Sequence, residues 1–108
     1  MSLSPAALAH VADYFKVLSE VSRLEVLCVL KTGEQNVGEI VEATGLGQAN
    51  VSKHLKVLTQ AGIISRRTSG TSVYYRISDE TTFALCELVC QRLVDRLDAQ
   101  ARQLGLVG

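Results

Sequence analysis

The chain has 108 residues, the size of one small domain, and 47% of them are hydrophobic, which excludes a disordered protein. No apolar run approaches the length of about 18 residues that a membrane span needs, and the start of the chain lacks a signal-peptide pattern, so we expect a cytoplasmic protein. The three cysteines, Cys28, Cys86 and Cys90, form no CxxC pair, which argues against a disulfide framework.

Charge is unevenly distributed along the chain, although eleven bases and eleven acids cancel overall. Residues 43–78 contain no acid and carry five bases, which gives this block a net charge of +5 and the remainder −5. Chance is one explanation. The other is an anionic partner, such as nucleic acid, for the middle of the chain.

Three helices are predicted in the first 45 residues. Ser4 and Pro5 are typical of a helix start, and apolar residues follow them at helical spacing. Ser22 is a candidate cap for a second helix, which Gly33 follows. A short third helix is predicted within residues 36–45, and Gly45 ends it.

A helix-turn-helix is predicted because a Gly-Leu-Gly turn separates the third helix from a fourth helix, Gln48–Gln60. Val51, Leu55 and Leu58 should point inward, which leaves a polar face suited to base edges and phosphates. The alternative is an ordinary pair of core helices. The expected contacts with duplex DNA on the fourth helix are Gln48, Ala49, Asn50, Ser52, Lys53, His54 and Lys56.

Residues 62–78 predict a β-hairpin, because two runs of β-branched and aromatic residues flank a turn at Gly70. A hairpin in this place is a wing that can reach DNA phosphates or the minor groove, with Arg66, Arg67 and Thr71 as expected contacts. A last helix is predicted from residue 79 to about 104. The expected fold is mainly α with a small β-hairpin: a winged helix-turn-helix of about five helices plus a wing, with residues 1–108 forming a single domain.

The segments "FKVLSEVSRLEVLCVL" and "VGEIVEATGLGQANVSKHLKVLTQAGIISRRTSGTSVYYRIS" resemble the ArsR/SmtB family of bacterial winged helix-turn-helix repressors. The match spans about residues 8–93, and its most specific part is "VSKHLKVLTQAGII" followed by "RRTSGTSVYYRI". The resemblance implies a homodimer that is built on the first and last helices, binds an inverted-repeat operator and leaves it when a small inducer binds. The expected interface residues are Leu8, Val11, Phe15, Leu88, Leu93 and Leu97.

The three cysteines are the candidate inducer site. Cys86 and Cys90 lie one helical turn apart, with Cβ atoms about 5–6 Å apart, which is too wide for an unstrained disulfide but suits a polysulfide link or a soft metal. The resemblance extends to persulfide-sensing members, which carry one cysteine at the place of Cys28 and another on the last helix, later than Cys90, around Val94. We therefore expect reactive sulfur or thiol oxidation to release the repressor from DNA. Which of Cys86 and Cys90 pairs with Cys28 stays open.

Several alternatives remain at this level. An arsenite-like metalloid held by Cys28, Cys86 and Cys90 is one, and ordinary core packing of the cysteines is another. A winged-helix interaction module without DNA binding is a third. No nucleophile, base or carboxylate pair converges, so an enzyme is not expected. No cofactor or resident metal is expected either, since the last helix lacks the histidine that zinc sensors of the resembled family use.

Overall fold

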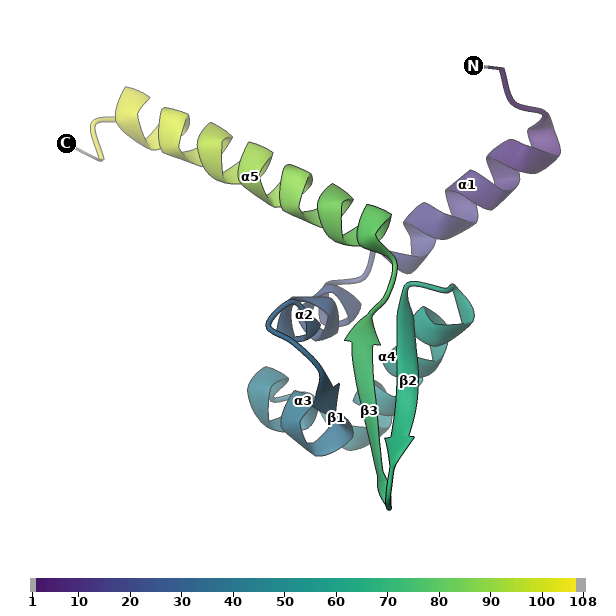
Figure 1. The fold of residues 1–108 in the computed structure, drawn as a ribbon. Helices are drawn as coiled ribbons and strands as arrows, with labels where there is room; N and C mark the ends of the chain where they lie inside the picture. Colours follow the sequence, from purple (N-terminus) through teal and green to yellow (C-terminus); the bar gives the residue numbers. More distant parts are fainter. Residues whose placement is uncertain (1, 107–108) are drawn as a thin grey trace.

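Five helices and a three-stranded sheet follow one another in the computed structural model, which describes residues 2–106 (Figure 1). The elements are α1 (Pro5–Val17), α2 (Val21–Leu30), β1 (Gln35–Asn36), α3 (Val37–Thr44), α4 (Gln48–Gln60), β2 (Ile64–Ser69), β3 (Ser72–Ile77) and α5 (Glu80–Gln103). The sheet is antiparallel, with the order β1-β3-β2. The predicted winged helix-turn-helix is confirmed, whereas the short strand β1 is absent from the sequence prediction.

Local signals set most helix ends where the sequence predicts them. At the start of α1 the Ser4 hydroxyl accepts a hydrogen bond from the Ala7 amide. At the start of α3 the side chains of Asn36 and Glu39 each accept a hydrogen bond from the backbone N–H of the other, which forms a capping box. Gly45 ends α3 with a φ of 74°, a conformation that glycine adopts without steric cost.

The start of α2 differs from the prediction. Glu20 occupies the cap position, and no side chain caps the helix. Ser22 lies inside the first turn, where its hydroxyl donates a hydrogen bond to Glu20 Oε1 at 2.9 Å and contacts His54 Nε2 at 2.8 Å. Ser22 therefore connects α2 to α4 and does not cap α2.

The buried core lies between α2, α3, α4 and the base of the wing. Its apolar side chains are Val26, Leu27, Leu30, Ile40, Val51, Leu55, Leu58, Ile63 and Ile64. The three core residues of α4 lie on one side of the helix, as the helical spacing predicts. This leaves the opposite side of α4 in solvent.

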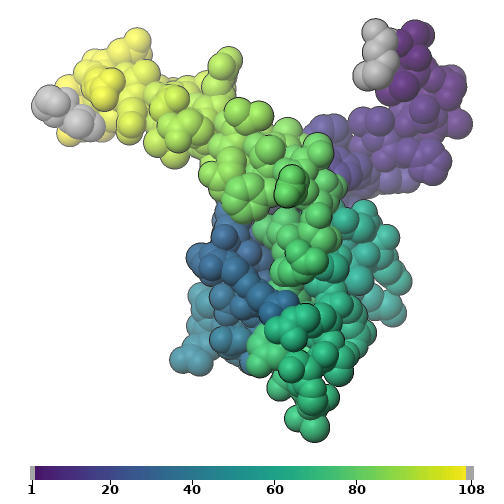
Figure 2. Space-filling model, in the orientation of Figure 1, coloured from purple at the N-terminus to yellow at the C-terminus, as the bar shows by residue number. Residues whose placement is uncertain are grey.

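Helices α1 and α5 extend away from this core as two separate arms (Figures 1 and 2). No residue of α1 is buried, and Thr82 is the one buried residue of α5. Within the single chain the expected interface residues are exposed, at 52% for Leu8, 41% for Val11, 51% for Phe15, 70% for Leu88, 49% for Leu93 and 62% for Leu97. Large apolar surfaces of this kind commonly mark an interface. Even so, no helix within residues 2–106 is long and apolar enough to cross a membrane.

Hydrogen bonds join the two arms at their base. Thr82 Oγ1 donates to Asp79 Oδ2 at 2.9 Å, and the Tyr14 hydroxyl lies 2.6 Å from Thr82 Oγ1. Because the single hydroxyl proton of Thr82 is used on Asp79, Tyr14 must donate to Thr82. This junction fixes the last turn of α1 against the first turn of α5.

Candidate nucleic-acid interface and cysteine groove

The solvent side of α4 carries the polar face that the sequence predicts. The exposed residues are Gln48, Ala49, Asn50, Ser52, Lys53 and Lys56. The helix starts directly after Gly47, and no side chain caps its first amides. These free N–H groups add partial positive charge at the start of the helix. The surface therefore offers hydrogen-bonding groups and positive charge to an anionic partner.

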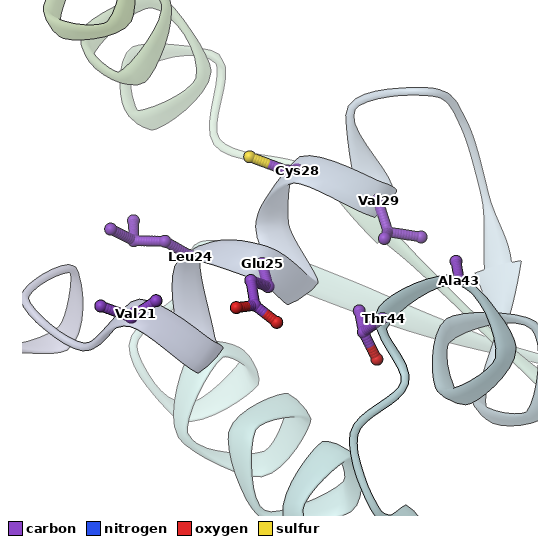
Figure 3. A pocket seen from close by; sticks show the side chains of 7 residues that line it. All are labelled: Val21, Leu24, Glu25, Cys28, Val29, Ala43 and Thr44. Carbon is purple, nitrogen blue, oxygen red and sulfur yellow. The ribbon is translucent and has the colours of Figure 1, made fainter.

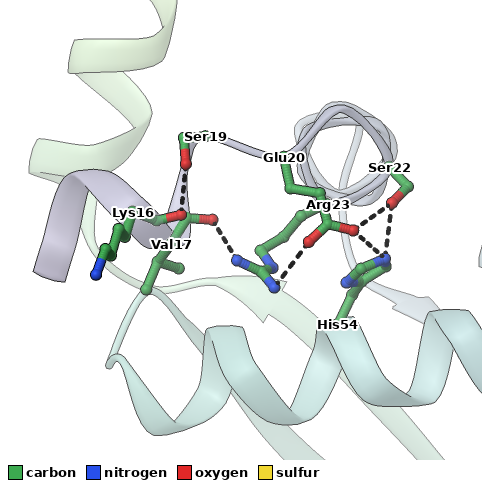
Figure 4. A network of polar contacts seen from close by, with 7 residues as sticks. All are labelled: Lys16, Val17, Ser19, Glu20, Ser22, Arg23 and His54. Carbon is green, nitrogen blue, oxygen red and sulfur yellow. Dashed lines mark hydrogen bonds and ion pairs between the residues drawn. The ribbon is translucent and has the colours of Figure 1, made fainter.

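His54 does not belong to this surface. It is only 2% exposed and lies on the core side of α4, so the structure corrects the expectation that its side chain contacts DNA. Its Nε2 atom lies 2.8 Å from Ser22 Oγ and 3.5 Å from Glu20 Oε1 (Figure 4). The physical reason is helical geometry, because position 54 falls beside the buried Leu55 and Leu58.

The available donors determine the proton positions in this polar cluster. Ser22 donates its one proton to Glu20, so His54 must donate from Nε2 to Ser22. The hydrogen bond from Ser22 lowers the pKa of Glu20, which keeps the carboxylate charged. The cluster therefore holds α2 against α4.

Arg67 of the wing is bound to Glu34. Its Nε and Nη2 atoms donate to the Glu34 carboxylate over distances of 2.6 to 3.1 Å, and its guanidinium carbon lies 5.1 Å from the centre of the Tyr74 ring. The other two expected wing contacts, Arg66 and Thr71, are exposed. The Nε and Nη2 donors of Arg67 are therefore already occupied, and no local pattern in the sequence predicts this.

Both members of this ion pair stay charged near neutral pH. The Arg67 guanidinium lowers the pKa of Glu34, and the Glu34 carboxylate raises the pKa of Arg67. Because the pair is open to solvent, salt screens it and its contribution to stability is small. Its main consequence is electrostatic, since Glu34 places a negative group beside the basic wing.

The three cysteines line one groove between α2 and α5, with a volume of about 340 Å³. Cys28 and Cys90 are exposed, and Cys86 is partly buried. The groove lies outside the buried core. Cys28 and Cys90 are therefore not core residues within the single chain. The remaining wall is apolar apart from Lys31 and is formed by Phe15, Leu18, Leu24, Leu27, Leu85, Val89 and Leu93.

An ion pair connects the two helices beside the cysteines. Lys31, the residue that directly follows α2, has its Nζ atom 2.9 Å from Glu87 Oε1 on α5. The hydrogen bond to Glu87 raises the pKa of Lys31, so the ammonium is firmly charged. Burial raises the pKa of Cys86, although the nearby ammonium opposes this effect. Cys86 therefore stays a thiol to higher pH than an ordinary cysteine does.

A preformed metalloid site is not present in the described part of the chain. Residues 2–106 contain no group of three or more His, Cys, Asp or Glu side chains placed to hold one metal ion. Cys28 also borders an open hollow of about 530 Å³ between α2 and α3 (Figure 3). Its sulfur points away from Ala43 and Thr44 on the far wall of this hollow. The groove beside α5 is therefore the better site for thiol chemistry.

Sequence reasoning missed Lys31, Glu34 and Glu87, and it expected Ser22 to cap α2 and not to contact His54. Each acts through a partner that lies far away in the sequence, and Glu34 is 33 residues from Arg67. One local signal was present, because Lys31 lies one helical turn after Cys28 and therefore shares its side of α2. Its partner on α5 has no such signal.

Comparisons of the sequence and of the fold with known proteins identify a family and several relatives. The model of the family described as "Bacterial regulatory protein, arsR family" matches residues 20–66. The HTH-type transcriptional regulator Rv0324 of Mycobacterium tuberculosis is 38% identical over 93% of this chain and 46% of its own length, so this chain spans about half of that relative. The transcriptional activator HlyU of Vibrio cholerae is 33% identical over 82% of this chain and 77% of its own length. The solution structure of Mb0332 from Mycobacterium bovis, described as a homodimeric winged helix-turn-helix DNA-binding domain, is 34% identical, with a TM-score of 0.73 over 88% of this chain and 94% of that chain.

The stability of two variants tests the buried position of His54. We expect His54→Ala to lower the free energy of unfolding by about 2–4 kcal/mol, because it leaves a cavity and removes the partner of Ser22. Lys53→Ala, on the exposed side of the same helix, should change it by less than about 0.5 kcal/mol. Urea unfolding followed by circular dichroism measures both. Equal effects of the two substitutions would contradict the buried position of His54.

Proposed function

The chain belongs to the arsR family of bacterial regulatory proteins, and on that premise we propose that it is a DNA-binding transcriptional repressor that cysteine chemistry releases from its operator. One observation carries the proposal. The exposed polar face of α4 is fixed on a buried core, and it lies in the block of residues 43–78 that contains no acid. A regulator of this kind acts on DNA in the cytoplasm.

In this proposal α4 enters the major groove of duplex DNA. Gln48 and Asn50 are able to form paired hydrogen bonds with adenine, and Ala49 is small enough to contact a thymine methyl group. The free amides at the start of α4 suit a phosphate. On the wing, Arg66 and Thr71 are exposed for contacts with the flanking backbone.

The partner of the two arms is proposed to be a second copy of the chain. The single chain leaves the apolar side chains of α1 and α5 in solvent, and the similar Mb0332 domain is described as homodimeric. A two-fold dimer presents two α4 helices to two half-sites. An inverted-repeat operator with half-sites about one helical turn apart, roughly 34–36 Å, matches that symmetry.

Reactive sulfur is the proposed inducer, and an organic trisulfide, RSSSR, illustrates the chemistry. One cysteine thiolate attacks the central sulfur and displaces RS⁻, which leaves a mixed trisulfide on the protein. A second thiolate attacks the transferred sulfur and displaces the second RS⁻. One sulfur atom then bridges two cysteine sulfurs, and the two RS⁻ take up the protons that the cysteines lost. The cysteines are oxidised while the trisulfide is reduced to two thiols.

The groove geometry favours a bridge between the two helices. Cys28 is on α2, and both other cysteines are on α5, so the bridge crosses the groove. A disulfide between Cys86 and Cys90 within one helix would be strained. The bridge draws α2 toward α5, and α2 packs on α4 through the core. The separation of the two α4 helices in the dimer changes, with a coupling free energy of about 1–3 kcal/mol typical of allostery.

Two alternatives have less support. A metalloid held by three thiolates needs sulfur atoms that are already gathered, and the described residues show no such group. A winged-helix module that binds only proteins would have no need for the exposed Gln48, Asn50 and Lys53 on an acid-free surface. We therefore place thiol-controlled DNA binding first.

Operator binding tests the α4 interface. Asn50→Ala should weaken binding to an operator, selected from random duplexes, by about 1–3 kcal/mol and leave binding to random DNA unchanged, because Asn50 reads a base edge. Arg66→Ala should weaken both and reduce the salt slope by about one charge. Fluorescence anisotropy over a salt series measures these effects. An unchanged sequence preference in Asn50→Ala would exclude α4 as the recognition helix.

The ion pair on the wing supplies matched controls for this experiment. Arg67→Ala should change the salt slope less than Arg66→Ala does, because Glu34 already neutralises Arg67. Glu34→Gln should tighten binding to random DNA, because it removes a negative group and releases Arg67. Equal losses in the two arginine variants, with no gain in Glu34→Gln, would show that the pair has no influence on binding.

Light scattering tests the dimer. At micromolar concentration the protein should have the mass of two chains, and Leu97→Glu should shift it toward one chain because the charge enters an apolar interface. Gln60→Glu, an exposed residue at the end of α4 outside the expected interface set, is the control and should remain dimeric. A monomeric wild-type protein would overturn the proposal.

The inducer is tested on the reduced protein bound to its operator. Glutathione trisulfide should release the DNA and add the mass of one sulfur less two hydrogens per chain, and dithiothreitol should reverse both changes. The variant with Cys28, Cys86 and Cys90 all changed to serine should stay bound.

Arsenite is tested in parallel. Release by a three-thiolate site should be lost in every single Cys→Ser variant, whereas release by a two-cysteine bridge tolerates the loss of one cysteine on α5. Release of the triple variant would refute cysteine sensing.

A further inference from the structure

We propose that Lys31, held in place by Glu87, is a positioning residue that makes Cys28 and Cys90 the reactive pair and leaves Cys86 unreactive. The inference rests on the proposed thiol function and goes beyond it by naming the pair and the group that activates it. The groove wall carries all three thiols, and Lys31 is the one basic side chain on that wall.

The ion pair sets the position of the ammonium. Lys31 is the C-cap of α2, three residues after Cys28, and its backbone is still helical. Cys90 follows Glu87 by three residues on α5, so each cysteine lies one helical turn from a member of the pair. The 2.9 Å contact between Lys31 Nζ and Glu87 Oε1 thus brings the two turns together. The Lys31 side chain is only 19% exposed, and it lines the groove together with the thiols.

An ammonium in this position favours thiolates, and the thiolate is the nucleophile in sulfur exchange. Lys31 attracts the charged forms of both Cys28 and Cys90, and this attraction contributes to the raised pKa of the lysine. The apolar wall around them weakens solvent screening, so the attraction is stronger than it is at an open surface. Cys28 and Cys90 are also the two exposed cysteines, which allows a sulfur donor to reach them.

Cys86 has the opposite environment. It is partly buried, and the loss of solvation raises the pKa of its thiol more than Lys31 lowers it. Apart from the three thiols, Lys31 is the one ionisable residue that lines the groove, because α1 contributes only Phe15 and Leu18 to the wall. Its partner Glu87 lies outside the lining. Glu25 borders the hollow on the α3 side of Cys28. The surroundings therefore separate two exposed thiols in the groove of the ammonium from one thiol that is partly buried.

The test is the pH dependence of thiol alkylation in the full-length reduced protein, without DNA or trisulfide. Iodoacetamide labelling followed by peptide mass spectrometry gives a rate and a pH midpoint for each cysteine. In the wild type, Cys28 and Cys90 should have lower midpoints than Cys86. Lys31→Met should raise the midpoints of Cys28 and Cys90 and slow their alkylation at pH 7 by about threefold to tenfold. Lys31→Arg should restore both, because the positive charge returns.

Controls separate this electrostatic role from a structural one. Lys56→Met removes a lysine from the exposed side of α4 and should leave all three midpoints unchanged. In urea the midpoints of wild type and Lys31→Met should coincide, and circular dichroism confirms that each variant folds. Lys31→Gln, which keeps the side-chain stem and a polar end, replaces Lys31→Met if that variant folds poorly. Unchanged midpoints for Cys28 and Cys90 in the folded lysine variants, or Cys86 as the fastest thiol, would overturn the proposal.

The alkylation result and the release of the operator can fail independently of each other. If the midpoints shift as expected but trisulfide leaves the DNA bound, the proposed function fails while the role of Lys31 stands. If trisulfide releases the DNA but the midpoints do not depend on Lys31, the proposed function stands and this inference fails. Cys90→Ser and Cys86→Ser then identify the partner of Cys28, because only Cys90→Ser should prevent the sulfur bridge.

Discussion

The burial of one side of α4 is the contact on which the exposed surfaces of the protein depend. Val51, Leu55 and Leu58 are almost completely excluded from water. Burying a side chain of this size stabilises the fold by about 1.5–3 kcal/mol, so these three residues determine how the helix is rotated about its axis. That rotation sets which residues stay outside. Asn50 and its polar neighbours face solvent because the apolar side has a single favourable position in the core.

Helix α2 connects this surface to the cysteine groove. Val26, Leu27 and Leu30 contribute to the core beneath α4, whereas Cys28 and Lys31 border the groove beside α5. Because protein interiors are closely packed, we expect a displacement of α2 to reach the α4 side chains that contact it. Chemistry that changes the distance between α2 and α5 therefore has a direct mechanical path to α4. In the proposed regulator, DNA binding and thiol sensing both depend on this one short helix.

Much of the fold follows from signals that act over a few residues. Ser4, Gly45 and Gly70 mark helix ends and the hairpin turn, and the structure places these boundaries where the sequence predicts them. The candidate site was less predictable, because its charges are decided by partners distant in sequence. His54 looked like a surface residue on chemical grounds, although its position among the core residues of α4 already indicated burial. Arg67 has no such local clue, since only the folded sheet brings Glu34 beside it.

The hydrogen-bonded junction of Tyr14, Thr82 and Asp79 lies at one end of a long rigid rod. Helix α5 has 24 residues, which corresponds to a length of about 36 Å at about 1.5 Å per residue. A tilt of about 5° at its base displaces its far end by about 3 Å over that length. Cys86 and Cys90 lie near the base, so a small rearrangement there is magnified along the arm as it is by a lever. In the proposed dimer, leverage of this kind would turn the insertion of one sulfur atom near the base of α5 into a larger displacement at its far end.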